Sequence, residues 1–352
     1  MQIDFHHAVT YVCARLAGFE KPEAETIAYA AQYVDDCTSS GTIYFENKAL
    51  YNRISSAHKM VDPRNAEELA NHQVWLPFHF LPGNGNKKAG EDPDGGFIEK
   101  IVCTPDSPVA QDMVRNCIEQ KHRAYGLHLL GVTMHVYADT WAHQNFAGVL
   151  HIINEVEDAE EISNSGIFDN GLGIWLRDIL DDAIPPLGHG RANVFPDMPF
   201  LSWKYKTGKN KEITQNNTEQ FCTAADKLCI AMKRHKLGNA DAAVTGIDQQ
   251  DMGRIRNLFT GTRIKDGDER HRVWLQAIAD GEFSFGREQL GYEPRGNNSW
   301  KARALGISHD MRVHTYKKDF IKSDWKLFHD AIQAHRFTVL HDILPDYDIC
   351  AA

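Results

Sequence analysis

Three side chains of types that bind metals recur at every fourth position of one apolar stretch. They are His135, Asp139 and His143. Four residues of an α-helix advance a side chain by only about 40° around the axis, so all three project from one face of the predicted helix. Their neighbours are mostly apolar, which predicts burial, and buried His and Asp side chains need polar partners. We interpret the row as ligands of zinc or a similar divalent ion, because imidazole nitrogens and carboxylate oxygens are its usual ligands.

Several other His and acidic residues could have either a structural or a functional role. His79 lies between two phenylalanines and can equally be a core histidine. Asp35 and Asp36 end a predicted helix, where they oppose the helix dipole unless a cation lies nearby. His151 and Glu155 form a further i, i+4 pair, although the acidic run that follows is typical of a solvated surface.

The irregular segment over residues 187–205, rich in Gly, Pro and aromatic residues, adds weaker candidates. His189 stands between two glycines, which would let it approach a ligand closely. Arg191, or Arg123 earlier in the chain, could meet negative charge that develops on a reacting group. Asp197 follows a proline, so it is either a turn residue or part of a site.

Composition and charge restrict the class of protein. With 42% hydrophobic and 24% charged residues, the chain resembles an ordinary globular protein. A formal net charge of −10 argues against a protein that grips nucleic acid, because such binding depends on neutralising phosphates. Seven cysteines are scattered without a CxxC pair, which favours free thiols in a reducing compartment over disulfides or a thiolate zinc site.

The termini and the hydropathy of the chain suggest a location. The first residues lack the basic and apolar regions of a secretory signal, and no window reaches the apolar length of a membrane span. We therefore expect a cytoplasmic protein without a transmembrane segment, while export by a route that needs no signal stays open. The sequence does not indicate an oligomeric state.

Apolar spacing and capping residues predict helices along most of the chain, with little strand signal. We therefore expect an all-α fold, with a metal-binding domain over residues 1–205 and a helical extension over residues 206–352 that is either separate or part of the same domain. The main predicted helices span residues 6–16, 23–36, 106–121, 125–148, 171–182, 212–236, 249–260, 269–280 and 325–344.

Together, these features resemble the superfamily of zinc-dependent phospholipase C and the fungal single-strand-specific nucleases. The most specific match is Asp139-Thr-Trp-Ala-His143-Gln-Asn145, which is similar to the Asp-x-x-x-His-x-Asn of bacterial members. From the N-terminus to residue 155, the other candidate ligands also occur in the same order along the chain as the metal ligands of that superfamily. The resemblance implies an all-helical fold of the phospholipase C type and a cluster of two or three zinc ions, with other divalent metals open.

The resemblance assigns metal ligands position by position. The family's early His is matched by His6, and the adjacent His7 is the alternative match. The family's Asp at the end of a helix is matched by Asp35, and the adjacent Asp36 is the alternative match. Asp139 is the carboxylate that bridges metals in the family. The implied ligand set is His6 or His7, Asp35, His79, His135, Asp139, His143, His151 and Glu155.

Two departures from the family pattern leave alternatives open. Family members usually expose a Trp whose amine and carbonyl bind one zinc, whereas this sequence has Met1. That site could be filled by the Met1 amine, by Asp4 or by neither, which would give two metals. The interval from His143 to His151 is also short, so His189 could replace His151 and Glu155 as a final ligand.

The resemblance implies hydrolysis of a phosphoester, most simply a small-molecule or lipid-headgroup phosphodiester. Asp35 or Asp36 is the candidate general base or an additional ligand. His128, one heptad before His135, and Asn145 are candidate hydrogen-bonding partners of the ligands.

Two other interpretations compete with this one. An HD-type phosphohydrolase, also helical, could use His329-Asp330 or His341-Asp342, although no further ligands stand out near them. A non-catalytic helical module with structural zinc is the second alternative. Structural zinc sites are closed by four protein ligands, whereas catalytic sites keep a position open, so the number of metals per chain separates these interpretations.

Overall fold

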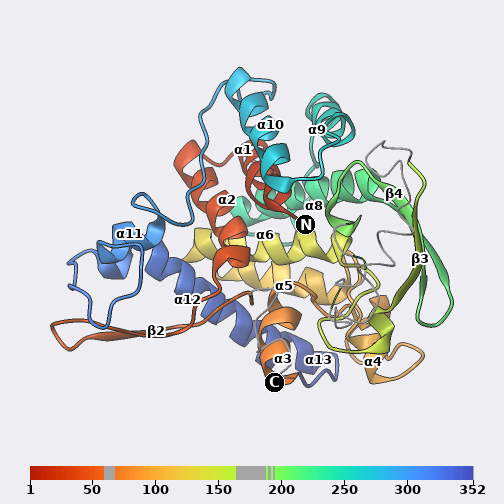
Figure 1. Cartoon of the computed structure of the whole chain (residues 1–352), viewed down its shortest axis with the longest axis horizontal. Helices are drawn as coiled ribbons and strands as arrows, with labels where there is room; N and C mark the ends of the chain where they lie inside the picture. Colours follow the sequence, from red (N-terminus) through yellow and green to blue (C-terminus); the bar gives the residue numbers. More distant parts are fainter. Residues whose placement is uncertain (59–67, 164–187, 189–191, 193–194, 352) are drawn as a thin grey trace.

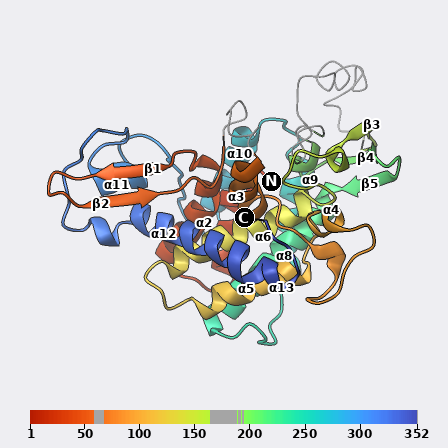
Figure 2. The ribbon, with the colours of Figure 1, turned by 90° about the horizontal axis from the view of Figure 1, so that it is seen from below.

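The computed structural model describes residues 1–58, 68–163, 188, 192 and 195–351. The predicted helix over residues 171–182 lies outside the described residues, as do His189 and Arg191. Figure 1 shows a helical body with a small sheet at one end and a two-stranded hairpin at the other. The same arrangement is visible from below in Figure 2.

Helix α6 (Gly126–Ala142) is the central element of the helical body. Every residue of α6 except Leu127 is buried, which explains why the sequence is apolar around most of the helix. The helix ends at Ala142, so the predicted extension to residue 148 is wrong, and His143 is its C-cap. The helices with the largest contacts to α6 (Figure 1) are α2 (Lys21–Asp36), α5 (Pro108–Glu119), α8 (Asn217–Leu237) and α12 (Asp324–Phe337).

The N-terminal segment forms the π-helical η1 (Asp4–Val9), which continues into α1 (Thr10–Leu16). Helix α2 then begins after Glu20, which forms a capping box with Glu23, and Pro22 occupies the first turn. Shorter elements follow before and after α5 and α6. They are α3 (Glu68–Phe78), η3 (Asn84–Asn86), α4 (Phe97–Lys100), η4 (Ile152–Asn154) and η6 (Phe195–Asp197).

The C-terminal half is mainly helical, as the sequence predicts. Its long helices each begin after an Asn, Asp or Ser whose side chain accepts a hydrogen bond from the first turn. Besides α8 and α12, the elements are α9 (Gln249–Gly261), α10 (Gly267–Asp280), α11 (Trp300–Leu305), η7 (Phe320–Lys322), η8 (Thr338–Ile343) and α13 (Leu344–Asp346).

The expectation of an all-α fold is wrong, because two antiparallel sheets are present in the described part of the chain. One is the hairpin of β1 (Gly41–Tyr44) and β2 (Leu50–Arg53). The other has the order β3-β4-β5. Its strands are β3 (Val156–Glu161), β4 (Ser202–Thr207) and β5 (Glu212–Asn216).

The missed strands are short and charged, which is why the sequence did not indicate them. In β4, Trp203 and Tyr205 are buried while the lysines between and after them face outward, and this alternation spans only a few residues. The acidic run of β3 pairs with those lysines, Glu160 with Lys204 and Asp158 with Lys206. The predicted helix over residues 212–236 therefore begins too early, because its first residues form β5.

The largest hydrophobic core contains residues from both halves of the sequence. The ring of Phe5, in η1, lies 5.4 Å from the ring of Phe221, in α8, and 6.1 Å from that of Phe259, in α9. Helix α10 also packs on η1. The division at residue 205 stays a prediction, but the N-terminal segment packs directly on the C-terminal half. Among the described residues, no helix combines the length and apolarity required to cross a membrane.

Gly131 allows α2 and α6 to pack closely. A Cβ atom at this position would lie 2.4 Å from the carbonyl oxygen of Ile27 and 2.7 Å from the Cβ of Ala30, both on α2. Backbone atoms of a packed helix cannot move aside without shifting the helix. The contact therefore fixes the distance between the two helices.

We predict that Gly131→Ala destabilises the protein by about 1 to 3 kcal/mol, because the added methyl group pushes α2 away from α6. Urea unfolding measures the change. Gly253→Ala is the matched control, since Gly253 lies in α9 and a Cβ there would meet no atom within 4 Å. The control should keep or slightly raise the stability. Equal stability of the two variants would contradict the close packing of α2 on α6.

Candidate metal centre

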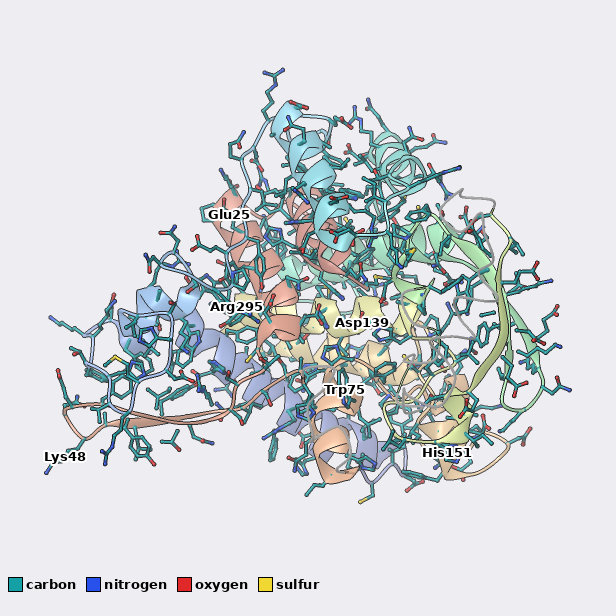
Figure 3. All side chains as sticks on the ribbon, in the orientation of Figure 1. Glu25, Lys48, Trp75, Asp139, His151 and Arg295 are labelled. Carbon is teal, nitrogen blue, oxygen red and sulfur yellow. The ribbon has the colours of Figure 1, made fainter. Side chains whose placement is uncertain are left out.

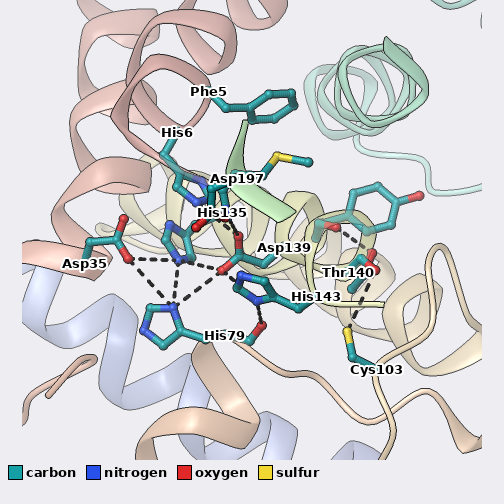
Figure 4. Close-up of polar contacts among 12 residues, drawn as sticks. Phe5, His6, Asp35, His79, Cys103, His135, Asp139, Thr140, His143 and Asp197 are labelled. Atoms are coloured by element: carbon teal, nitrogen blue, oxygen red, sulfur yellow. Dashed lines mark hydrogen bonds and ion pairs between the residues drawn. The ribbon is translucent and has the colours of Figure 1, made fainter. Parts of the chain in front are cut away.

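The carboxylate of Asp139 lies at the centre of a buried polar cluster (Figure 4). Its Oδ1 atom is 2.7 Å from the α-amino nitrogen of Met1 and 3.1 Å from His6 Nε2. Its Oδ2 atom is 3.3 Å from His135 Nε2, 3.5 Å from His79 Nδ1 and 3.6 Å from His143 Nδ1. The two oxygens of one carboxylate therefore face two different sets of nitrogen donors.

Two groups of three residues in this cluster have ligand atoms close enough to share a metal ion. In the first group, His6, His135 and Asp139 bring one ligand atom each within 4.8 Å of one another. In the second, Asp35, His79 and His135 do the same. His135 belongs to both groups, so the two candidate positions are adjacent.

Elements far apart in the sequence position these side chains. His135 and Asp139 are one helical turn apart on α6, which is the arrangement that their spacing predicts. His6 comes from η1, and Asp35 from the last turn of α2. His79 follows the end of α3, where Pro77 lies in the last turn. The packing of α2 and α3 on α6 brings the four segments together.

Backbone carbonyls orient two of the imidazole rings. His135 Nδ1 is 2.8 Å from the carbonyl oxygen of Ala31, and His79 Nε2 is 2.9 Å from that of Ser56. A carbonyl oxygen only accepts, so each of these nitrogens carries the proton. The other nitrogen of each ring, His135 Nε2 or His79 Nδ1, is then a lone-pair donor directed at the cluster. Metal-binding histidines are commonly held in this way.

His143 is placed differently from the prediction. Because it caps α6, its ring does not continue the helical row, and Nδ1 lies 2.6 Å from the carbonyl oxygen of His79. That nitrogen is therefore committed to the backbone of the segment that carries His79. His143 touches Asp139 but belongs to neither group of three.

His6 provides the test of whether the cluster suits a metal ion. The residue is fully buried, its Nε2 atom lies 3.1 Å from Asp139 Oδ1, and its Nδ1 atom has no hydrogen-bond partner among the described residues. A buried polar atom left unpaired costs about 1 to 3 kcal/mol, so such atoms usually have a partner. Burial lowers the pKa of His6 to about 4, which keeps the ring neutral, the form that binds metals. The donors at this site therefore fit a divalent ion.

Electrostatics keep the central carboxylate ionised. Burial alone would raise the pKa of Asp139, but His143 and the α-amino group of Met1 hold it well below its usual range. Burial alone would lower the pKa of that amine, but Asp139 and Asp197 raise it to about 11. The amine lies 3.2 Å from Asp197 Oδ1. Asp197, in η6, therefore lies beside the candidate metal centre. The sequence offered it as either a turn residue or part of a site.

Asp4, which the sequence offers as an alternative ligand for the first position, pairs with a cation and belongs to neither candidate group in the described chain. Its carboxylate pairs with Arg270, whose Nε atom is 2.6 Å from Asp4 Oδ2. Arg270 also donates to Gln2 Oε1 at 2.7 Å and to the backbone carbonyls of Ile264 and Lys265. Both members of this ion pair are buried. A side chain of α10 thus anchors the segment that carries His6.

His7 and Asp36 pair with residues of the C-terminal half. His7 Nδ1 is 2.9 Å from His271 Nε2, and the ring of His7 packs against Tyr292. Burial and the neighbouring His271 lower the pKa of His7 well below its usual value. The hydroxyl of Tyr292 donates to Asp36 Oδ2 at 2.7 Å. Neither residue belongs to a group of possible ligands in the described chain, so their roles as ligand or base stay predictions.

The remaining candidates lie outside the cluster. His128 Nε2 faces Asp324 Oδ1 at 3.2 Å, and Asn145 lies in the turn after α6 with a positive φ of 71°. His151 accepts a hydrogen bond from the backbone of Ile153, and Figure 3 shows it far from Asp139. Glu155 follows the single turn of η4 and leads into β3.

The histidines of the HD-type alternative are also separate from any candidate metal group. His329 is buried with its ring 4.4 Å from that of Trp325. Asp330 accepts a hydrogen bond from Tyr51 and pairs with Lys326. In the part of the chain that the structure describes, no group of three possible ligands includes His329 or His341.

A cavity of about 790 Å³ opens beside the cluster. Met1 and Asp35 line it from the side of the metal centre. Most of the opposite wall comes from α10 and the loop after it, which the sequence did not connect with the site. The lining also includes Gln32, Asp36, His271, Tyr292 and Pro294.

We predict that Arg270→Met lowers the stability by about 3 to 5 kcal/mol, because it leaves the carboxylate of Asp4 buried without its cation. It should also weaken zinc binding, since η1 loses its anchor. Thermal unfolding and zinc titration measure the two effects. Adding Asp4→Asn in the same chain removes the uncompensated charge and should recover part of the stability. Wild-type stability and zinc affinity in Arg270→Met would contradict the anchoring role.

Comparison with known proteins gives a family without an assigned activity. No curated protein and no solved structure matches the chain. Residues 1–343 match the model of a family described as a family of unknown function, DUF6765. The match continues far beyond residue 155 and includes the segment with Arg270 and Tyr292 that completes the cavity. Because it spans nearly all of the 352 residues, the chain belongs to the DUF6765 family.

Proposed function

We propose that the protein is a zinc-dependent phosphodiesterase similar to phospholipase C, acting on a small-molecule or lipid-headgroup phosphoester. The observation that carries the proposal is the position of Asp139 between two sets of donors. Oδ1 faces His6, and Oδ2 faces His79 and His135. A carboxylate in this position can bridge two metal ions, as the resemblance to the family implies.

The types of donor favour zinc. Neutral imidazole nitrogens and carboxylate oxygens are typical zinc ligands, and no cysteine thiol belongs to the candidate groups in the described chain. Bound divalent ions would lower the pKa of a coordinated water to roughly 7 and neutralise charge on the phosphoryl oxygens. The chain would contribute the fixed ring orientations of His79 and His135 and the low dielectric of the buried centre.

Asp35 is our candidate for proton transfer. Its Oδ1 atom is 3.8 Å from both His79 Nδ1 and His135 Nε2, so this oxygen can act as a ligand. Its side chain is 35% exposed and lines the cavity, unlike that of Asp139, which is 1% exposed. The second oxygen of Asp35 can therefore accept a proton from a water molecule that enters the cavity.

The cavity suits a compact substrate. It adjoins the metal centre through Met1 and Asp35, and its volume of about 790 Å³ is in the range of small-molecule sites. The net charge of −10 does not favour a long nucleic acid as the substrate. The scissile phosphoryl group would lie beside Asp35, with the rest of the substrate between α2 and α10.

We predict that the purified protein binds two or three zinc ions per chain and that His135→Ala loses at least one of them, because Nε2 of His135, the ring nitrogen with the free lone pair, can bind an ion of either candidate group. Elemental analysis after dialysis measures the count. His341→Ala is the control, since His341 is exposed and lies in no such group; it should keep all the zinc. One zinc per chain would favour the structural-zinc alternative, and loss of zinc in His341→Ala would favour the HD-type alternative.

We predict metal-dependent hydrolysis of bis-p-nitrophenyl phosphate, abolished by a chelator and restored by added zinc. Asp35→Asn should lower kcat by about 10²- to 10⁴-fold, because it removes the proton acceptor. Phosphomonoesters and choline-headgroup lipids tested in parallel define the substrate range. Full turnover by metal-stripped protein would contradict the proposal.

A further inference from the structure

The hairpin of β1 and β2 has one face that packs on the helical body and one face that does not. Ile43, Phe45 and Tyr51 belong to the packed face. The ring of Phe45 lies 4.8 Å from that of Phe320, and the ring of Tyr51 lies 6.2 Å from that of Trp325. Because successive side chains of a strand alternate between the two faces, the residues between these three point outward.

Three large apolar side chains lie together on the outward face. Tyr44 and Leu50 are directly opposite each other in the register, and they are 53% and 64% exposed. Beside β1, His314 pairs with Phe45, and its N–H donates to the carbonyl of Tyr44 at 2.8 Å. Val313, 45% exposed, therefore points to the same side as Tyr44. We call Tyr44, Leu50 and Val313 the outer hairpin face. Adjacent exposed apolar side chains of this kind mark interaction sites.

Cations without a partner accompany the outer hairpin face. Lys48, in the turn between the strands, and Arg312 are exposed and form no ion pair among the described residues, whereas Arg53 on the packed face pairs with Asp310. Residues 300–326, at the same end of the molecule, contain seven Lys or Arg and three Asp, although the whole chain has 38 basic and 48 acidic residues. Figure 2 shows this basic end opposite the β3-β4-β5 sheet.

The backbone at Lys48 has a conformation that suits glycine better than lysine. Its φ is +69°, in the left-handed region. The turn is fixed by hydrogen bonds, from the N–H of Lys48 to the carbonyl of Phe45 and from the N–H of Ala49 to Asn47 Oδ1. Figure 3 shows Lys48 at the outer end of the hairpin. A lysine here costs stability and gains no ion pair in the described chain, which indicates a partner outside the chain.

We propose that the outer hairpin face, together with Lys48 and Arg312, binds an anionic lipid surface. Apolar side chains beside Lys and Arg are the combination that holds peripheral proteins in the headgroup region of anionic bilayers. Tyr44 suits that boundary, because its ring is apolar and its hydroxyl is polar. The acidic remainder of the chain is repelled by such a surface, which leaves the basic end to approach it. The inference does not depend on the proposed phosphodiesterase function.

A second copy of the chain fits the outer hairpin face less well than lipid does. Two-fold pairing of this face would bring the Lys48 and Arg312 side chains of both copies close to one another. Like charges placed together across an interface oppose association. An anionic bilayer instead offers the opposite charge to both residues, so the charges favour a lipid surface as the occupant.

Flotation of the zinc-loaded protein with vesicles tests the inference. Vesicles of phosphatidylcholine alone are compared with vesicles that also contain phosphatidylserine, at low and at high salt. At low salt we expect about tenfold stronger partitioning onto the phosphatidylserine vesicles, and high salt should remove most of this preference because ions screen exposed charges. Equal partitioning onto both kinds of vesicle, or none onto either, would overturn the inference.

Two single variants test the face itself. Leu50→Asn removes an apolar side chain and should weaken partitioning about tenfold. Lys48→Gly removes a cation and should weaken it about fivefold. Glycine also relieves the backbone at this position, so thermal stability should stay equal or rise, and a folding defect cannot then explain the loss. The matched controls are Leu237→Asn, at the exposed end of α8, and Lys88→Gly, in an exposed loop; both should partition like the wild type.

Partitioning of Leu50→Asn and Lys48→Gly at the wild-type level would overturn the assignment to this face. A dimer seen by analytical ultracentrifugation, dissociated by Leu50→Asn in a protein that binds no vesicle, would replace lipid by a second copy of the chain. Soluble bis-p-nitrophenyl phosphate does not need this face, so its hydrolysis should be unchanged in both variants. Vesicle binding by a protein that lacks this hydrolysis would support the inference and refute the phosphodiesterase.

Discussion

A buried carboxylate with donors on both sides is the constraint on which the other parts of the structure depend. Asp139 is 1% exposed and ionised, so the fold must supply positive or electrophilic partners for both of its oxygens. Helix α6 holds the carboxylate at the centre of the helical body. The close contact at Gly131 brings α2 near enough for the carbonyl of Ala31 to orient His135. Packing and site chemistry are therefore linked through the same helix pair.

The constraint also explains why the C-terminal half belongs to the site. His6 reaches Asp139 only if the N-terminal segment is held against α6, and the buried ion pair between Asp4 and Arg270 provides that anchor. The same helix, α10, forms the wall of the cavity opposite Gln32. The half of the chain without a recognisable motif thus positions one candidate ligand and forms part of the cavity wall, and the family match covers both halves.

The sequence predicts those parts of the site that depend on local geometry. The spacing of His135 and Asp139 defines one helix face, and the structure keeps that face. The prediction for His143 was less accurate, because α6 ends one residue earlier than the row requires. The roles of His6, Asp35 and His79 came only from their order in a resemblance, since their approach to Asp139 is a matter of tertiary packing. The anchoring role of Arg270 could not be recognised, because a buried arginine and an exposed one look alike in a sequence. In the fold, the alternation of buried and exposed residues in β4 was too short to outweigh the helical pattern around it.

The central proposal is that the two oxygens of Asp139 would hold different metal ions. Crystals of the zinc-loaded protein, with anomalous scattering measured on both sides of the zinc absorption edge, test it directly. At least two zinc peaks should flank the carboxylate, one beside His6 and one beside His79, with His135 next to them. A single peak enclosed by four protein ligands, or zinc bound elsewhere with Asp139 left unligated, would contradict the claim.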